Sequence, residues 1–328
     1  MKKLILGIDT SNYTTSLALV SGGVILKNVR RLLPVKEGVC GLRQSDAVFL
    51  HTKALPELAH ELFESEAYTP GELAAVAVSD KPRDADGSYM PCFLAGVSFA
   101  EAVALSCGVP LYRFSHQSGH IMAGISSCAE GLGGTLDRAE RFLSFHVSGG
   151  TTEALLVEKS GGSFSYTIIG GTNDASAGQI IDRAGVFAGL PFPCGRALDE
   201  CAAGAAKKLP RCVSMNGAYF SFSGLQNKFE SYLTHGETLA DSAAFLFDSI
   251  GEALSRSTDA ARARFGAELP VLYAGGVMSN THIRTRLSAK ENVFFASPAL
   301  SSDNACGTAL LGERRYAESQ AERNGETV

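Results

Sequence analysis

The sequence is poor in several features that would point to particular classes of protein. Its formal net charge is −5, so it lacks the excess of Lys and Arg with which many proteins contact nucleic-acid phosphates. Any contact with nucleic acid would therefore need a local basic patch or the help of a partner. No apolar stretch reaches the length of a membrane span, and the run "FLAGVSFAEAVAL" is interrupted by Glu101.

Signals for secretion and for cysteine-based metal sites are also lacking. The stretch "MKKLILGIDTSNY" imitates a signal peptide for six residues, but Asp9, Ser11 and Asn12 then break the apolar run. We therefore expect a cytoplasmic protein that does not interact with membranes. The eight cysteines form no CxxC pair, which favours free thiols over a zinc-cysteine site. The HExxH motif of zinc proteases is absent as well.

An internal repeat is the first positive feature. Residues 6–20, "LGIDTSNYTTSLALV", align without a gap with residues 143–157, "LSFHVSGGTTEALLV". Each segment reads as an apolar strand, a tight polar turn and a returning strand. Turns rich in Ser, Thr, Gly and Asn present backbone N–H groups and hydroxyls that suit an anion. The repeat indicates two related lobes, although β-hairpins also resemble one another by chance.

The remaining chain alternates predicted strands and helices, which is typical of α/β architecture. Helical patterns cover "DAVFLHTKALPELAHELFE", residues near 93–107 and residues 240–264, and short apolar strands separate them. A further helix is expected to start near Asp303. We expect a first lobe over residues 1–110, a second lobe over 111–315 that holds the metal and nucleotide sites, and a frayed polar tail over 316–328.

The segment "SHQSGH" places His116 and His120 four residues apart, on one face of a helix. With Asp303 as a third ligand, the two imidazoles would form a catalytic metal site with open positions for substrate or water. Two solvated histidines with no common function would show the same spacing.

Three further positions could contact a nucleotide. "YAGGVMSN" (273–280) reads as a strand, two glycines and a helix, and glycines let a ligand approach the backbone closely. "GLPFPCG" (189–195) is a rigid loop that could equally be a plain connector. Asp182 and Asp199 flank this loop, and each could bind a ribose hydroxyl or remain a solvated carboxylate.

Taken together, these motifs resemble the TsaD (Gcp) family, which makes threonylcarbamoyladenosine in tRNA. The segments "GIDTS", "SHQSGH", "VSGGTTE", "GLPFPCG", "FSFSGLQN", "AGGVMSN" and "SSDNA" occur in the family's order, across roughly residues 3–315. The resemblance implies the two-lobed actin/sugar-kinase/Hsp70 (ASKHA) fold with duplicated lobes. The name glycoprotease has been attached to the family, but nothing in this sequence supports proteolysis.

The resemblance also implies site residues. His116, His120 and Asp303 match the positions at which the family binds iron or zinc. The resemblance also implies an adenylate or ATP-type nucleotide, with or without Mg²⁺. Its expected contacts, of which Asp199 is an addition to those of the family, are His146, Val147, Ser148, Gly149, Gly150, Thr151, Asp182, Gly195, Asp199 and Asn280.

The implied reaction moves a threonylcarbamoyl group from threonylcarbamoyl-AMP to N6 of an adenosine in the tRNA anticodon loop. The metal would act as Lewis acid and template, and AMP would leave. Asp9 and Ser11 would orient or deprotonate the attacking amine. The family works with a smaller TsaD-like paralogue and an ATPase, so both are expected partners alongside tRNA.

Several positions depart from the family's pattern. Thr14 stands where the family has an acidic residue, Thr151 where it has histidine, and Gln179 where it has glutamate. The loop at 79–96 differs from the family's "GPG" turn, and only His51 remains of its "SRDH". Four hypotheses stay open: a tRNA enzyme with drifted positions, a divergent paralogue with another acceptor, a non-catalytic partner of a true TsaD, and a kinase or ATPase. The histidine pair argues against the last.

Overall fold

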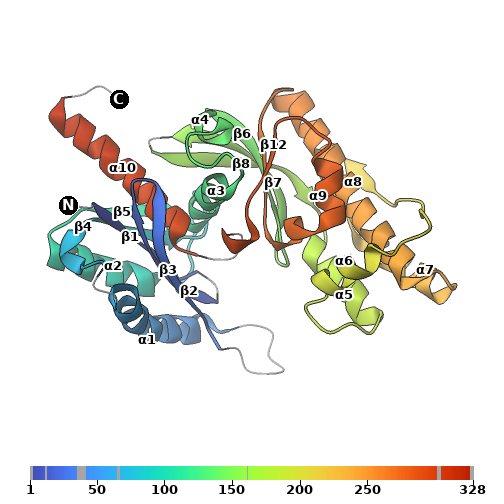
Figure 1. Cartoon of the computed structure of the whole chain (residues 1–328), viewed down its shortest axis with the longest axis horizontal. Coiled ribbons are helices and arrows are strands. Elements are labelled where there is room, and N and C mark those ends of the chain that lie inside the picture. Colours follow the sequence, from blue (N-terminus) through green and yellow to red (C-terminus); the bar gives the residue numbers. More distant parts are fainter. Residues whose placement is uncertain are drawn as a thin grey trace. The chain divides into compact units, whose positions relative to one another are not determined.

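The computed structural model describes residues 3–11, 13–34, 42–64, 67–160, 162–300 and 304–325. Its contacts divide the chain into two compact units. The first unit comprises Met1–Ser127, Lys159–Ser165 and Ser302–Val328, and the second comprises Cys128–Glu158 and Tyr166–Ser301. Each unit is built on its own sheet (Figure 1).

The first unit contains a five-stranded sheet in the order β3-β2-β1-β4-β5. Its strands are β1 (Leu4–Asp9), β2 (Thr14–Ser21), β3 (Val24–Leu32), β4 (Leu73–Lys81) and β5 (Leu111–Ser115). Strands β1, β2 and β3 form an antiparallel meander, whereas β4 and β5 run parallel to β1. Every residue of β1 is buried, as expected for a central strand covered on both faces.

Helices cover both faces of this sheet. They are α1 (Gln44–Phe63), α2 (Phe93–Cys107), α3 (His116–Ser127) and α10 (Cys306–Asn324), with a short 3-10 turn η1 (Pro70–Glu72). Leu55 and Leu58 of α1 pack in one core with Val76 and Val78 of β4. Burial of each such leucine stabilises the fold by roughly 2 kcal/mol.

Helix α10 packs on α3 and on strands β1 and β4. Glycine makes this close approach possible, because a Cβ at Gly7 would lie 2.5 Å from the carbonyl oxygen of Ala305. A Cβ at Gly307 would lie only 1.8 Å from the carbonyl oxygen of Gly119 in α3. The two helices therefore touch backbone to backbone.

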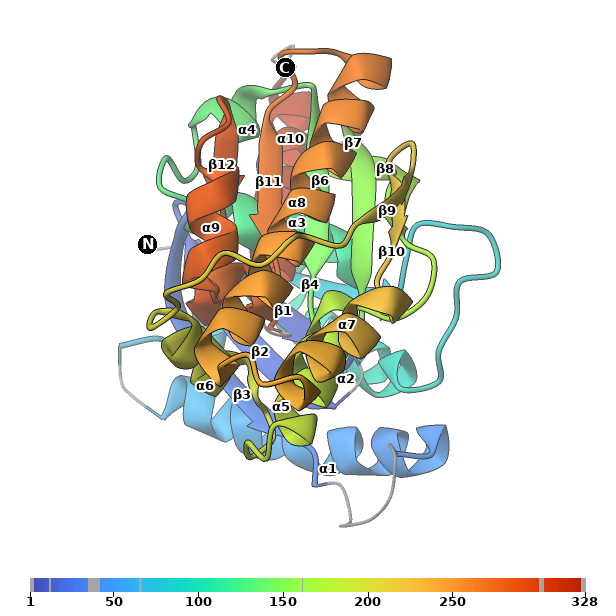
Figure 2. The same ribbon diagram turned by 90° about the vertical axis from the view of Figure 1, so that its right-hand side faces the viewer.

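The second unit has a seven-stranded sheet in the order β12-β11-β6-β7-β8-β10-β9. Its strands are β6 (Arg141–Val147), β7 (Thr152–Ser160), β8 (Ser163–Thr172), β9 (Ser214–Asn216), β10 (Tyr219–Ser221), β11 (Val271–Ala274) and β12 (Val293–Phe295). Its helices are α4 (Thr135–Arg138), α5 (Ala177–Phe187), α6 (Gly195–Ala202), α7 (Ser223–Thr234), α8 (Leu239–Phe265) and α9 (Thr281–Leu287), with 3-10 turns η2 (Gly276–Ser279) and η3 (Pro298–Leu300). Figure 2 shows α8 crossing this sheet, and Phe245 and Ile250 of α8 share a core with Leu143 and Phe145 of β6.

The two sheets share one plan, which confirms the fold class expected from the repeat. The order β3-β2-β1-β4-β5 of the first unit is repeated as β8-β7-β6-β11-β12 in the second. The register is preserved as well: Leu6 pairs with Leu19, and the aligned Leu143 pairs with Leu156. Both sheets place two parallel strands beside an antiparallel meander.

The chain divides differently from the expected ranges 1–110, 111–315 and 316–328. Strand β5 and helix α3 belong to the first unit, because β5 extends its sheet beside β4 and α3 packs on α10. The candidate histidines therefore lie in the first unit. The expected tail is largely helical, since α10 continues to Asn324 and the hydroxyl of Ser319 bonds that of Tyr112 at 2.6 Å. Among the described residues, each helix is too short or too polar to cross a bilayer.

Candidate active-site residues

Three candidate residues of the first unit form a hydrogen-bonded row. Asp9 ends β1, and His116 and His120 lie in the first turns of α3. The Nδ1 atom of His116 lies 2.8 Å from Oδ2 of Asp9, and its Nε2 atom lies 2.8 Å from Nε2 of His120. The imidazole centroids are 4.3 Å apart. The two imidazoles thus lie on one face of α3, as the spacing predicted, and their Nε2 atoms face each other.

Asp9 is a buried carboxylate held in its charged form. Burial would raise its pKa, but the charge of the His116 imidazole and hydrogen bonds from His116, Ser11 and Ser79 outweigh that effect and leave the pKa below its ordinary value. Ser11 donates both its N–H, at 2.9 Å, and its hydroxyl, at 2.5 Å, to Oδ1 of Asp9. Asp9 and Ser11 are each 1% exposed. The carboxylate of Asp9 therefore links Ser11 to His116.

The donor chemistry of this row fits a transition metal. Imidazole nitrogens suit zinc and iron, and a ligating histidine usually donates its other N–H to a carboxylate, as the contact between His116 and Asp9 allows. The expected third ligand, Asp303, lies outside the described residues. Within the described ranges no group of three His, Cys, Asp or Glu side chains is placed to hold a metal ion.

Asp84 fixes the start of α3, a role that no motif in the sequence indicated. The hydroxyls of Ser115 and Ser118 donate to Oδ2 of Asp84 at 2.7 and 2.9 Å, and Ser115 also accepts the N–H of Ser118. The backbone of Gln117 bonds the carbonyl of Pro82. The loop that departs from the family's pattern is therefore tied to the first turn of the histidine helix.

A second group of candidates lines a pocket of about 500 Å³ within the second unit. Half of the predicted nucleotide contacts face this pocket: Gly149, Asp182, Gly195, Asp199 and Asn280. The others, in the stretch 146–151, belong to the end of β6 and the turn that contains Gly149. Gly276 and Ser279 of the "YAGGVMSN" segment also line it, as do three residues that the sequence did not single out: Gly178, Arg196 and Phe247.

The turn after β6 is closed by its own serine. The hydroxyl of Ser148 accepts the N–H groups of Gly150 and Thr151 at 3.3 and 3.0 Å. The first turn of α5 packs against it, because a Cβ at Gly178 would lie 2.5 Å from the Cα of Gly149. An anion at this turn would meet the start of a helix, whereas the N–H groups of Gly150 and Thr151 already donate to Ser148.

Asp182 and Asp199 hold the pocket walls in place. Oδ1 of Asp182 accepts the N–H of Cys194 at 2.8 Å, which fixes the "GLPFPCG" loop. Oδ1 of Asp199 accepts Nδ2 of Asn280 at 2.7 Å and the hydroxyl of Thr281 at 3.0 Å. Asn280 in turn caps α9 by accepting the N–H of Ile283. Both carboxylates therefore stabilise the pocket walls, whether or not they also contact a ligand.

The "FSFSGL" segment now has a structural role. Phe220 and Phe222 are buried in the core of the second unit. Asp174 accepts the N–H groups of Phe222 and Ser223 at 2.9 and 2.8 Å, so its carboxylate caps the start of α7. Burial would raise the pKa of Asp174, but these hydrogen bonds prevail and lower it below its ordinary value of 3.8.

Asp174→Asn is expected to lower the free energy of unfolding by about 1 kcal/mol at pH 7, because an amide NH₂ replaces one of the two oxygens that accept N–H groups. Because the pKa is depressed in the folded state, the carboxylate stabilises the protein above its ordinary pKa, and the effect is lost as the pH falls through the lowered value. Urea unfolding at pH 7 measures the first effect, and a series of pH values continued well below 3.8 measures the loss. Asp86→Asn, at an exposed position, is the control. Equal stability of variant and wild type at pH 7 would contradict the cap.

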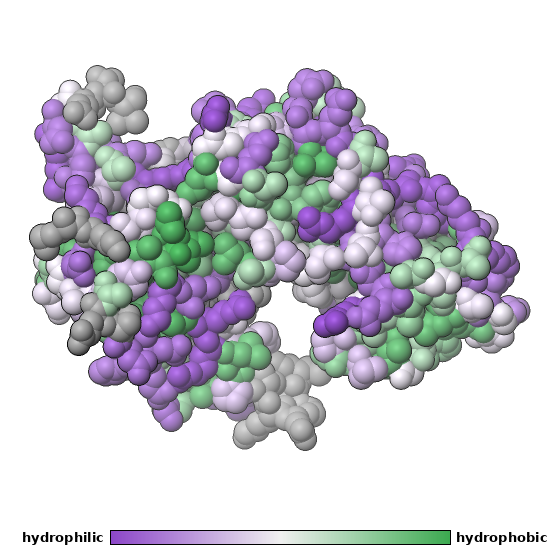
Figure 3. Space-filling model, in the orientation of Figure 1, coloured by the Kyte–Doolittle hydropathy of each residue, from purple (hydrophilic) through white to green (hydrophobic). Residues whose placement is uncertain are grey.

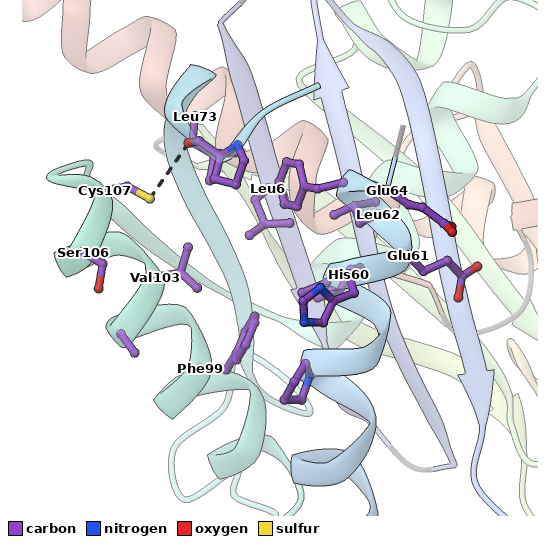
Figure 4. A pocket seen from close by; sticks show the side chains of 16 residues that line it. Leu6, His60, Glu61, Leu62, Glu64, Leu73, Phe99, Val103, Ser106 and Cys107 are labelled. Carbon is purple, nitrogen blue, oxygen red and sulfur yellow. Dashed lines mark hydrogen bonds between the residues drawn. The ribbon is translucent and has the colours of Figure 1, made fainter. Parts of the chain in front are cut away.

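Another cavity, of about 870 Å³, lies in the first unit between α1, α2 and the sheet. Figure 4 shows His60 and Leu62 of α1 and Phe99 and Val103 of α2 around it, with Leu6 of β1 nearby. Its lining is mostly apolar, and it includes none of the candidate site residues.

Comparison with known proteins identifies the family. The family model TsaD, described as tRNA N6-adenosine threonylcarbamoyltransferase, matches residues 39–310. The tRNA N6-adenosine threonylcarbamoyltransferase of Streptococcus suis (strain 05ZYH33) is 31% identical over 333 residues, which cover 96% of this chain and 93% of that protein. The enzyme of the same name from Desulfitobacterium hafniense (strain Y51) is 32% identical over 329 residues, covering 95% and 92%.

Solved structures agree on the fold. Component A of (R)-2-hydroxyglutaryl-CoA dehydratase from Acidaminococcus fermentans matches with a TM-score of 0.56 at 16% identity, covering 96% of this chain and 99% of that chain. Full-length HypF matches with a TM-score of 0.56 at 12% identity, covering 99% and 47%. At these identities the likeness shows the actin-like α/β fold alone. By its sequence, the chain belongs to the TsaD family, and it is a transferase rather than a protease.

Proposed function

We propose that this chain transfers a threonylcarbamoyl group from threonylcarbamoyl-AMP to N6 of an adenosine in the anticodon loop of tRNA, with the help of a bound metal ion. The observation that carries the proposal is the row formed by Asp9, His116 and His120, in which two imidazole nitrogens converge and a buried carboxylate backs one of them. A tRNA substrate and the tRNA-modifying relatives favour the cytoplasm as its location.

His116 and His120 would hold an iron or zinc ion, with Asp303 as the third ligand. The ion would supply Lewis acidity at the acyl carbonyl. With the ion bound, Asp9 would hold His116 as its neutral tautomer, because a carboxylate at Nδ1 keeps a proton there and leaves the Nε2 lone pair for the ion. Ser11 holds the Asp9 carboxylate through two hydrogen bonds. Asp9 and Ser11 thus orient the metal ligand rather than reach the acceptor amine.

The pocket of the second unit would hold the adenylate. Gly149 and Gly178 bring the Ser148–Thr151 turn and the start of α5 together, where the phosphate would be bound. Asp182, Gly195, Asp199 and Asn280 line the remaining wall, where the ribose and adenine would lie. Mg²⁺ could accompany a triphosphate at this position.

Some of the residues that depart from the family's pattern could change which acceptor is used. Gln179 forms a capping box with Ser176, which a glutamate would form equally well, so this change does not affect the start of α5. At Thr14, at Thr151 and in the 79–96 loop, the residues present do not reproduce a contact that the family's residues would make. The alternative proposal is therefore a paralogue that binds metal and adenylate but carbamoylates another acceptor, or a non-catalytic partner of a true TsaD. A smaller paralogue and an ATPase are proposed partners of the complete enzyme.

Incorporation of threonine into tRNA tests the proposal. The purified chain is incubated with labelled threonine, bicarbonate, ATP, an adenylate-forming enzyme, unmodified tRNA and the two partner proteins. Label is expected in tRNA and absent when the chain is left out. If the adenylate is consumed only when another acceptor is supplied, the paralogue is correct, and if the chain retains no metal and consumes nothing, it is a binding partner.

A further inference from the structure

Exposed aromatic and cationic side chains gather where α5 leads into α6. Phe187 at the end of α5 is 50% exposed, Phe192 in the following loop is 73% exposed, and Val186 is 56% exposed. Arg183 and Arg196 are exposed beside them on α5 and α6. We call these five side chains the α5–α6 surface. Figure 3 shows hydrophobic and hydrophilic atoms side by side over this part of the second unit.

The α5–α6 surface borders the candidate nucleotide pocket. Arg196 lines that pocket, and so does Pro193, the residue after Phe192. On α5, Arg183 follows directly after Asp182, which also lines the pocket. Arg183 and Phe187 are four residues apart, so both lie on one face of the helix. The surface is therefore continuous with the rim of the pocket.

The positive charge of this surface is open to a ligand. Arg183 forms no ion pair with any residue in the described ranges. Arg196 pairs with Glu200, but both side chains are largely exposed, and such a pair is worth little in water. The neighbouring acids Asp182 and Asp199 already accept hydrogen bonds from Cys194 and Asn280.

We infer that the α5–α6 surface binds unpaired bases of the RNA acceptor, with the two phenyl rings stacking on bases and the two guanidiniums contacting phosphates. This inference rests on the proposed function. Single-stranded RNA is recognised by exposed aromatic rings and arginines in this combination. A protein partner fits less well, because three exposed apolar side chains are too few for the core of a stable protein interface.

Binding of a fluorescently labelled, unmodified tRNA anticodon stem-loop to the full chain tests the surface. Phe192→Ala is expected to weaken binding by about tenfold, the effect of losing one stacked base. Arg183→Gln is expected to weaken it less and to reduce the slope of log affinity against log salt by about one. AMP binding should be unchanged in both variants, which shows that the pocket is still folded.

Two matched controls separate this surface from general effects. Leu105→Ala removes an apolar side chain that is 86% exposed on α2, and Arg256→Gln removes an exposed arginine on α8. Both controls should bind the stem-loop like the wild type. If Phe192→Ala and Arg183→Gln also bind like the wild type, the inference is wrong while the proposed function stands.

Two other outcomes also overturn the inference. If Phe192→Ala keeps its RNA affinity but loses binding to the ATPase or to the smaller paralogue, the surface is a protein interface. If the wild type neither binds the stem-loop nor labels tRNA with threonine, the proposed function itself fails.

Discussion

His116→Ala is expected to abolish metal binding and to reduce threonylcarbamoyl transfer by about a hundredfold or more. The substitution removes one of two imidazoles whose Nε2 atoms lie 2.8 Å apart, and it leaves the Asp9 carboxylate buried without its histidine. Outer contacts to metal ligands alone typically change affinity by about 10–100-fold, so loss of a ligand should exceed that range. Metal content after purification and dialysis, measured by elemental analysis, checks the first part.

The row of Asp9, His116 and His120 also predicts a smaller loss of metal affinity when Asp9 rather than a histidine is changed. Asp9→Asn keeps the shape of the side chain but removes the charge that orients His116, and metal affinity should fall by about 10–100-fold rather than vanish. His235→Ala is the matched control, because this histidine lies at the end of α7 and bonds Ser231. A His116→Ala protein that retains one metal ion per chain would refute the site.

The fold could be predicted largely from local patterns. The hairpins of β1–β2 and β6–β7 are short-range structures, and their alternation of apolar strands and polar turns is written in consecutive residues. The division of the chain into two units depends on contacts between residues far apart in the sequence. Helix α10 returns to the sheet of β1 through glycine contacts such as that of Gly7 with Ala305, and sequence order alone places it in the second lobe.

The candidate site shows the same contrast. The spacing of His116 and His120 needs only helix geometry, so it could be read directly. The contact of His116 with Asp9 spans 107 residues, and nothing in the sequence assigned Asp9 to the histidine rather than to the acceptor. Asp84 lies in an unusual loop, and only the structure shows that it holds Ser115.

Glycine and carboxylate motifs marked five residues that line the pocket of the second unit as candidate nucleotide contacts, a role that stays a prediction. The contacts of these residues with one another were not predicted. The sequence left Asp199 as either a ribose contact or a solvated carboxylate, and in the structure it bonds Asn280 across 81 residues. Gly178 and Gly149 meet because α5 starts beside the turn, a packing that neither segment encodes alone. Motifs therefore indicated candidate residues, whereas the interactions between them depended on the fold.

Gly307→Ala is expected to lower the free energy of unfolding by about 3 kcal/mol or more, at the upper end of the range for overpacked sites. A Cβ at this position would lie 1.8 Å from the carbonyl oxygen of Gly119 and 2.8 Å from the N atom of Ala123, both in the backbone of α3. A flexible side chain could turn aside, but a helix backbone has to move as a whole. Urea unfolding of the variant and the wild type measures the effect.

The strain should reach the metal site, because Gly119 lies between His116 and His120. We expect Gly307→Ala to weaken metal binding even in protein that remains folded. Gly119→Ala should be milder, since its Cβ meets the side-chain hydroxyl of Thr308 at 2.8 Å rather than backbone. Gly224→Ala on α7 meets nothing within 4 Å and should leave stability unchanged or slightly increased. If Gly307→Ala were as stable as Gly224→Ala and bound metal normally, α3 and α10 would not be in backbone contact, and the placement of the histidines by that contact would be wrong.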